Sequence, residues 1–428
     1  MFKLKLINFI FVLCCLLCVI WTIPSLIAFR NILLGIGGIF SLYFIYKNIN
    51  IINITNTISI KLLGFLIIWV IVHFIFISID RNLQLIELTG LWFRTVSAML
   101  MASVLVVYLN QYRQSFLIFG ICIGATVLIN ISFYIYQSFF EQRFILPGEL
   151  MGRPFYKIET VFWGTILIAY ANACLSIYIK QEKTSIKIII YYFVAIFLAL
   201  FSAFLSVAKN GILIANVLIF AFIISSLASF SIKKNKIIVL TISSILIVLI
   251  LFFSYLHLKT ANGWSTLIND ASIGIQIEKY EHWKNPSNGS PPNVISPSTY
   301  DRIAWGIAGF KLILDHPLGY GLINQSFESW LKYLQIEHQT SRQTHSGWID
   351  FGLAFGLPGI AILWAAVVSI LYKSLRQKSF LSVFAVWICS ALFILGFISE
   401  IFYKQFFEAL MFWFSFGAVA IALHTNKE

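Results

Sequence analysis

The 428-residue sequence predicts an all-α polytopic membrane protein. Hydrophobic residues make up 60% of the chain and charged residues only 11%, whereas a soluble domain carries roughly 25% charged residues. Apolar runs of about 18 residues or more recur along nearly the whole length, and each is long enough to cross the roughly 30 Å hydrocarbon core of a bilayer. Lys and Arg residues concentrate in alternate connections between these runs, which is the charge pattern of membrane topology.

The apolar runs predict about twelve transmembrane helices. The expected spans are 6–28, 31–46, 60–79, 88–109, 116–138, 160–179, 188–207, 211–230, 237–256, 347–371, 380–399 and 405–424. Residues 1–256 would then hold helices 1–9, residues 257–346 a large outer loop, and residues 347–428 helices 10–12. The first run follows Lys3 and Lys5, and we expect a retained span because no convincing small-residue cleavage site follows it.

The formal net charge of +13 is explained in part by topology, without a nucleic-acid partner. With the N-terminus inside, the inner connections hold a regular set of cations, namely Lys47, Lys61, Arg113, Lys180, Lys183, Lys187, Lys233, Lys234, Lys236, Lys373, Arg376 and Lys378. This is the positive-inside distribution, and it places both termini in the cytoplasm. The remaining cations lie on the outer side and need a separate explanation.

Two amphipathic helices are expected in the outer loop. The first follows a capping-box pattern, with Ser298 at the start and Asp301 three residues later. Its apolar positions recur at the helical spacing, at Ile303, Ile307, Phe310 and Leu314. It should end before Pro317, because the residue preceding a proline is disfavoured in the helical region. The second is predicted by Phe327, Trp330, Leu331 and Leu334, and both could lie on the membrane surface or cap the bundle.

Four outer residues are candidates for chemistry. His345 precedes the tenth span, and an unperturbed histidine, titrating near pH 6.5, can accept a proton at neutral pH. Arg302 offers a fork of donors that matches phosphate oxygens, in a position where its charge opposes the helix dipole. Lys209 and Arg153 are cations in outer connections. The structural alternatives are a polar loop end for His345 and solvated or interfacial cations for the others.

Arg94 lies inside the fourth predicted span, where a charge is costly and is usually paired or functional. Glu87, about two turns away, is a candidate partner, which favours a structural role for Arg94.

The sequence offers no motif for a metal, ATP or a redox cofactor. H-E-x-x-H, Walker-type and G-x-G-x-x-G patterns are absent from it. The six cysteines all lie inside apolar runs, which argues against a disulfide framework or a metal-ligand cluster. An outer cationic site without access to ATP needs a pre-activated donor, and a lipid diphosphate meets that need.

Three motifs together resemble the bacterial O-antigen ligase family, which also includes O-antigen polymerases and protein O-oligosaccharyltransferases. They are Arg302-Ile-Ala-Trp305, Asp315-His-Pro-Leu-Gly-Tyr-Gly321, and His345-Ser-Gly-Trp-Ile-Asp350 followed by Gly356-Leu-Pro-Gly359. The chain departs from the family where a Ser-Arg-Gly turn usually stands, since it has Ala208-Lys209-Asn210 there. It also has Ala354 where an acidic residue is often found.

The resemblance implies a glycan transfer from undecaprenyl diphosphate to an acceptor hydroxyl, at a periplasmic site of the bacterial inner membrane, without metal or cofactor. His345 matches the general base and Arg302 the diphosphate-binding arginine. Lys209 would replace the family arginine, and Arg153 is retained on charge and position alone. Trp305 and Asp350, which lie within the motifs, are expected to support the site.

Several acceptors remain open. Ligation of O-antigen to lipid A–core is the leading hypothesis, supported by the compact length and the His345–Asp350 segment. A polymerase acting on the same lipid carrier and a protein O-oligosaccharyltransferase are the alternatives within the family. A twelve-helix transporter is the rival from another class, but the sequence shows no repeated halves and its polar residues cluster outside the membrane. A scaffold protein would not need the outer cations.

Overall fold

A computed structural model describes residues 2–21, 23–48, 57–140, 157–180, 185–228, 236–261, 263–284, 290–336, 343–377 and 379–423. All regular secondary structure within these ranges is helical, so the predicted all-α class is confirmed. Arg153 lies outside the described residues.

Eleven helical segments of the described chain are long and apolar enough to cross a membrane, and a shorter apolar helix, Leu4–Ile20, precedes them. The membrane helices are α1 (Phe2–Ile20), α2 (Ile27–Lys47), α3 (Ile58–Phe76), α4 (Arg81–Glu87) continued by the π-helical turn η4 (Leu88–Trp92) and α5 (Phe93–Gln111), α6 (Ser115–Phe140), α7 (Lys157–Lys180), α8 (Ile186–Leu205), α9 (Lys209–Ala228), α10 (Lys236–Thr260), α14 (Gly347–Arg376), α15 (Phe380–Ile398) and α16 (Lys404–Ala422). The first span is shorter than predicted: it ends at Ile20, because Pro24 starts a separate 3-10 turn (η1, Pro24–Leu26).

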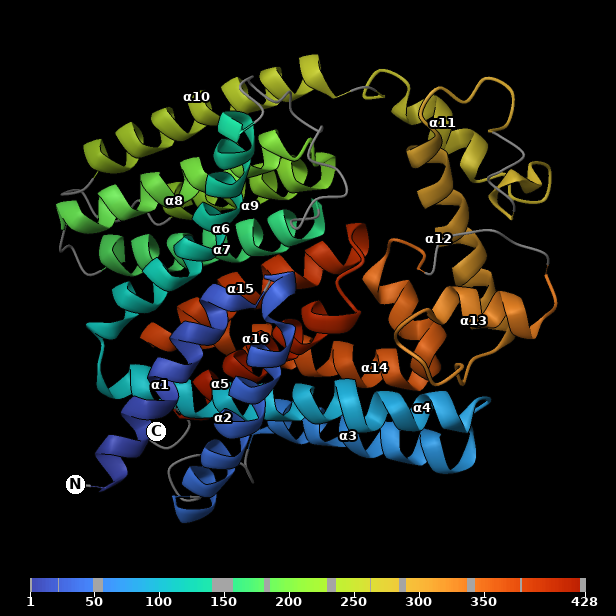
Figure 1. The fold of residues 1–428 in the computed structure, drawn as a ribbon. Coiled ribbons are helices and arrows are strands. Elements are labelled where there is room, and N and C mark those ends of the chain that lie inside the picture. Colours follow the sequence, from blue (N-terminus) through green and yellow to red (C-terminus); the bar gives the residue numbers. More distant parts are fainter. Residues whose placement is uncertain are drawn as a thin grey trace.

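The membrane helices run side by side in several layers (Figure 1). Helices α8 and α10 form the upper part of this view, and α3 and α4 the lower part. Helices α7 and α16 are the central ones, because 94% of the residues in each apolar window are buried. A helix that is apolar on all sides needs such an interior position.

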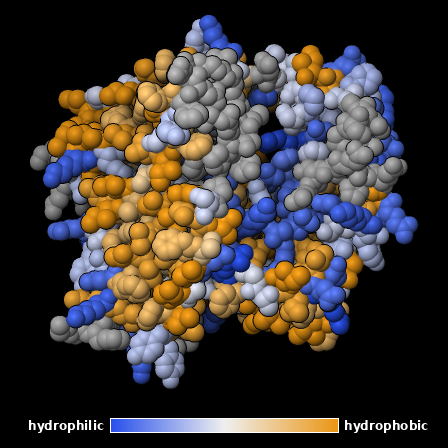
Figure 2. Space-filling model, in the orientation of Figure 1, coloured by the Kyte–Doolittle hydropathy of each residue, from blue (hydrophilic) through white to orange (hydrophobic). Residues whose placement is uncertain are grey.

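The long loop between α10 and α14 adds short helices at one end of the bundle. They are α11 (Leu267–Gly274), the 3-10 turn η6 (Glu281–Trp283), α12 (Pro297–Asp315) and α13 (Ser326–Tyr333). Helices α11, α12 and α13 gather at the right of Figure 1, whereas α1 begins at the left. Figure 2 shows the matching change in surface: hydrophobic residues cover the left and centre, and hydrophilic residues gather at the right.

Helix α12 differs from its prediction in two ways. The cap residue is Ser296 and not Ser298, and the helix begins with Pro297, whose fixed backbone angle suits the first helical position. The buried face consists of Tyr300, Ala304, Trp305, Ala308, Gly309 and Ile313. Phe310 and Leu314, which were predicted to face inward, are 52% and 55% exposed. The small residues are buried because α12 packs closely on α14, and a Cβ on Gly309 would lie 2.7 Å from Ile349 Cγ2.

Helix α14 is kinked, and the preceding loop fills the kink. Gly356 has φ 66° and ψ −170°, and Pro358 has no N–H to offer the carbonyl of Ala354. That carbonyl accepts a hydrogen bond from Gly321 N instead, at 2.7 Å. The freed carbonyl of Leu353 accepts from Tyr320 N at 2.8 Å. The Asp315–Gly321 motif and the Gly356–Gly359 motif therefore meet in one junction, where backbone hydrogen bonds join the loop to the kink in α14.

Helix α4 holds the loop that follows Gly321 at this junction. Glu87 accepts hydrogen bonds from the backbone N–H groups of Ile323 at 2.8 Å and Asn324 at 2.7 Å.

The predicted pairing of Glu87 with Arg94 is therefore wrong. Arg94 Nε instead lies 2.6 Å from Glu408 Oε1, and Glu408 Oε2 also lies 3.7 Å from Arg30 Nε. The charged side chain in the span is paired, as expected, but across helices.

Candidate active site

His345 lies in the turn before α14 and is paired with a carboxylate. Its Nδ1 is 3.0 Å from Glu400 Oε2, and the two side chains are 23% and 24% exposed. The backbone of His345 has φ 63°, a conformation that non-glycine residues rarely adopt. Such conformations persist where the surroundings determine them, often at functional sites. Glu400 was not among the residues selected from the sequence, because nothing in the sequence pairs the segment after α15 with the turn before α14.

Asp350 fixes the turn that carries His345. Its Oδ1 accepts two hydrogen bonds from Thr344, one from the backbone N–H and one from the hydroxyl, both at 2.8 Å. Asp350 and Thr344 are each only 1% exposed. Asp350 thus holds Thr344, the residue directly before His345, and supports the backbone that positions the imidazole.

Trp305 forms one wall beside the imidazole. Its ring centroid is 5.5 Å from that of His345, with the planes inclined by 30°. The indole N–H donates to the Trp283 carbonyl at 3.0 Å, which holds the ring in place. One turn earlier in α12, desolvation raises the pKa of Asp301 to about 6, although the charge of the nearby His345 lowers it.

The segment that carries Glu400 is anchored on both sides. Before it, Asn210 Nδ2 donates to Ser399 Oγ at 2.5 Å, and Gly347 N donates to the Ser399 carbonyl at 3.0 Å. After it, Lys404 N donates to Asn324 Oδ1 at 3.1 Å. The position of Glu400 is therefore set by three separate parts of the chain.

Arg302 lies within electrostatic range of Glu400 in this pair. Its side chain is solvent-exposed, yet desolvation by the surrounding protein lowers its pKa, while the charge of Glu400 raises it. A guanidinium stays charged despite such a shift. Figure 2 shows the surface hollowed on the side of the loop helices, with hydrophilic residues bordering the hollow.

Two lysines extend the cationic region, and each is the first residue of a membrane helix. Lys209 begins α9 and Lys157 begins α7. Lys157 lies within electrostatic range of both Arg302 and Lys209. A lysine at a helix N-terminus opposes the helix dipole, and the three cations repel one another, so the cluster favours a bound anion. Lys157 is not among the residues predicted from the sequence, since its distance from Lys209 along the chain hides their proximity.

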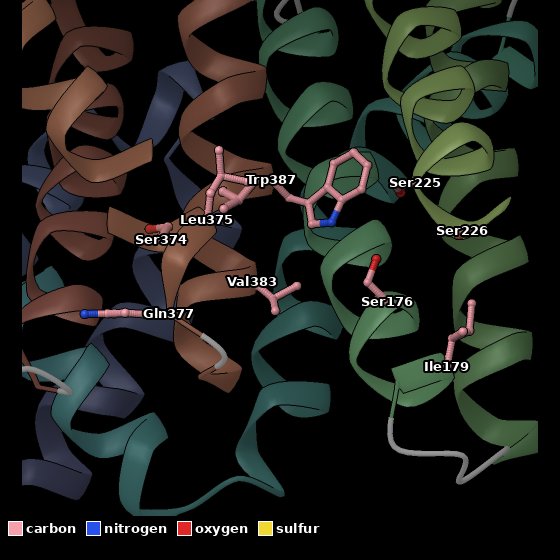
Figure 3. Close-up of a pocket in the computed structure, with 10 residues that line it drawn as sticks. Ser176, Ile179, Ser225, Ser226, Ser374, Leu375, Gln377, Val383 and Trp387 are labelled. Carbon is pink, nitrogen blue, oxygen red and sulfur yellow. The ribbon is translucent and has the colours of Figure 1, made fainter. Parts of the chain in front are cut away.

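The structure therefore brings together four of the predicted residues, Arg302, His345, Trp305 and Asp350, and places Lys209 beside Arg302. A cavity of about 200 Å³ lies elsewhere, lined by Ser176, Ser225, Ser226, Ser374, Gln377 and Trp387 (Figure 3). It lies toward the C-terminal ends of α7, α9 and α14, whereas Lys157, Lys209 and His345 lie at their N-terminal ends. The cavity is thus at the opposite end of these helices and has no titratable side chain in its lining.

Within the described ranges, no group of three or more His, Cys, Asp or Glu side chains is arranged to hold a metal ion. The chemistry available from the assembled side chains is proton transfer at His345 and binding of an anion by the arginine and lysines.

Comparisons with known proteins show a family resemblance over part of the chain. Residues 194–364 match the family described as O-antigen ligase, and this segment contains Lys209, Arg302, Trp305, His345 and Asp350. No curated protein matched the chain. Over residues 194–364 the chain is therefore similar to the O-antigen ligase family, which supports a glycosyltransferase of the ligase/polymerase type, and the chain is a multi-pass membrane protein.

Proposed function

We propose that the protein transfers an O-antigen glycan from undecaprenyl diphosphate to a hydroxyl of lipid A–core, in the assembly of lipopolysaccharide. The reaction is metal-independent and inverts the anomeric carbon. It takes place at the periplasmic face of the bacterial inner membrane, with both termini of the chain in the cytoplasm. The observation that carries the proposal is the His345–Glu400 pair, at 3.0 Å, within electrostatic range of Arg302.

His345 acts as the general base. A neutral imidazole has one donor and one acceptor nitrogen. With Nδ1 facing the Glu400 carboxylate, the proton belongs on Nδ1, and Nε2 keeps the free electron pair. Nε2 can then take the proton of the acceptor hydroxyl, and Glu400 stabilises the imidazolium that forms. The Asp350–Thr344 contacts and the Trp305 ring support this orientation.

Arg302 and Lys209 bind the diphosphate, with Arg153 as a further ligand proposed from the sequence. The cationic region is outside the bundle's apolar interior, which suits a donor with an apolar tail in the membrane and a charged head at its surface. Lysine lacks the bidentate fork of arginine, so Lys209 acts as a point charge.

The transfer is a single displacement. The acceptor oxygen forms a bond to the anomeric carbon as its proton passes to His345 Nε2. The bond between the anomeric carbon and the diphosphate oxygen breaks, and its electron pair leaves with the diphosphate. Arg302 and Lys209 stabilise the charge that develops there, an effect worth about 10²–10³ in rate for each well-placed donor.

The acceptor separates this proposal from its alternatives, an O-antigen polymerase and a protein O-oligosaccharyltransferase. The test uses purified protein, glycan-loaded undecaprenyl diphosphate and three acceptors in parallel: lipid A–core, a second lipid-linked glycan, and a serine-containing peptide. Product with lipid A–core alone supports the ligase. Product with only the lipid-linked glycan or the peptide would replace it by the corresponding alternative. Solute flux in proteoliposomes without any glycan product would support a transporter instead.

A further inference from the structure

His257, in the last turn of α10, has a buried hydrogen-bond donor without a partner. The side chain is 0% exposed. Its Nδ1 accepts a hydrogen bond from the indole N–H of Trp264 at 3.0 Å. Its Nε2 has no partner among the described residues. A buried polar atom in this state calls for an explanation, such as a catalytic role or a bound water or ion.

The Trp264 contact determines which nitrogen carries the proton. An indole N–H can only donate, so His257 Nδ1 must have a free electron pair. The proton of the neutral imidazole is then on Nε2. The orphaned atom is therefore an N–H donor for which no described residue supplies an acceptor.

The surroundings specify an anionic acceptor. The ring of Trp264 also contacts Lys209, whose Nζ lies 5.9 Å from the ring centroid. Lys209 and Lys157 are both within electrostatic range of His257. An oxygen that accepts from Nε2, within electrostatic range of these two ammonium groups, is stabilised if it carries negative charge.

We propose that His257 is a further donor-binding residue, whose Nε2–H donates to an oxygen of the diphosphate that Lys209 and Arg302 bind. This inference rests on the proposed function for the identity of the anion. Trp264 is a positioning residue, because it fixes the imidazole tautomer and contacts Lys209 at the same time.

His73 provides a matched comparison within the chain. It is also 0% exposed, and its Nδ1 likewise faces a side-chain donor, Gln84 Nε2 at 3.3 Å. Its Nε2, however, lies 3.0 Å from the Leu318 carbonyl. His73 therefore has the same tautomer with the donor satisfied by the protein, and replacing it should damage the fold and not ligand binding.

The test measures binding of undecaprenyl diphosphate without a glycan to purified full-length protein. The variants are Trp264→Phe, the double variant Trp264→Phe/His257→Phe, and His73→Phe. Replacing Trp264 first removes the indole N–H that would otherwise lose its acceptor. We expect the double variant to bind about tenfold more weakly than Trp264→Phe, with no lower unfolding temperature in the absence of ligand. His73→Phe should unfold at a lower temperature, while its folded fraction binds with unchanged affinity.

Equal affinity of the double variant and Trp264→Phe would overturn the inference, as would a loss of affinity that only follows a loss of folded protein. Absence of binding by the wild type would overturn it together with the proposed function. If the wild type binds, the double variant binds more weakly, and no acceptor receives a glycan, the role of His257 is supported and the proposed transfer is not. The binding assay thus separates the two failures.

Discussion

The Nδ1 atom of His345 lies 3.0 Å from Oε2 of Glu400, which joins the turn before α14 to the turn between α15 and α16. In the proposed mechanism this contact keeps the His345 Nε2 electron pair available and stabilises the imidazolium. Glu400→Gln removes the charge while keeping the shape. We expect the turnover rate kcat to fall about 10²-fold, within the range of general-base effects, measured as glycan transfer at saturating donor.

Glu278→Gln is the matched control for that variant. Glu278 pairs with Lys311 at 2.6 Å on the surface, where its side chain is 85% exposed, so its loss should leave kcat unchanged. An equal effect of both substitutions would argue against a specific role for Glu400.

Asn210 connects the helix that begins with Lys209 to the segment that carries Glu400, through its hydrogen bond to Ser399. Asn210→Ala should lower kcat by about tenfold or more, because small displacements of catalytic groups are costly, with a smaller change in the KM for the donor. Asn216→Ala removes a similar amide-to-serine bond, to Ser254 at 2.9 Å, on the same helix. If both variants lose kcat equally, the effect comes from α9 in general and not from the contact with Ser399.

Gly356 is required by the kink in α14. It has a positive φ, and a Cβ there would overlap the carbonyl oxygen of Pro317. Gly356→Ala should destabilise the protein by about 3 kcal/mol or more, from backbone strain and overpacking combined. Gly64→Ala is the comparison, since a Cβ on Gly64 meets nothing within 4 Å and should be neutral or slightly stabilising. Thermal unfolding of both variants measures the difference, and equal stability would show that the junction tolerates a side chain.

Asp301 should make stability depend on pH. Desolvation raises its pKa from 3.8 to about 6, against the charge of His345. Between these values the folded state binds more protons than the unfolded state, so stability falls as pH rises, by at most about 3 kcal/mol. Asp301→Asn should remove this dependence and stabilise the protein at pH 7 more than at pH 4. The measurement is the free energy of unfolding of wild type and variant at several pH values between 4 and 7. The same pH dependence for both proteins would contradict the assignment.

The fold could be predicted from the sequence because the lipid bilayer requires a long apolar run of residues in each membrane span. Apolar length and the distribution of cations predict the membrane helices to within a few residues at most positions. The first span was predicted too long because the run of apolar residues continues past Pro24, and hydropathy does not register a break in the backbone. The face of α12 was mispredicted for a different reason: large apolar side chains suggested a buried face, whereas close packing on α14 requires Ala304, Ala308 and Gly309 there.

Only part of the candidate site could be predicted from the sequence. His345 and Arg302 lie within motifs, so their spacing could be recognised. Glu400, Lys157 and His257 join the site through folding alone, and each is unremarkable within its own stretch of sequence. The partner of Arg94 illustrates the same limit, because Glu408 lies on another helix while Glu87, the nearer carboxylate along the chain, binds two backbone N–H groups of the outer loop.

The most direct test of the account is glycan transfer by wild type and His345→Ala, with glycan-loaded undecaprenyl diphosphate as donor and lipid A–core as acceptor. His282→Ala, a loop histidine outside the proposed site, serves as the control. The account predicts product from the wild type and the control, and almost none from His345→Ala at an unchanged unfolding temperature and unchanged donor binding. Equal product from all three would contradict the assignment of His345 as the general base.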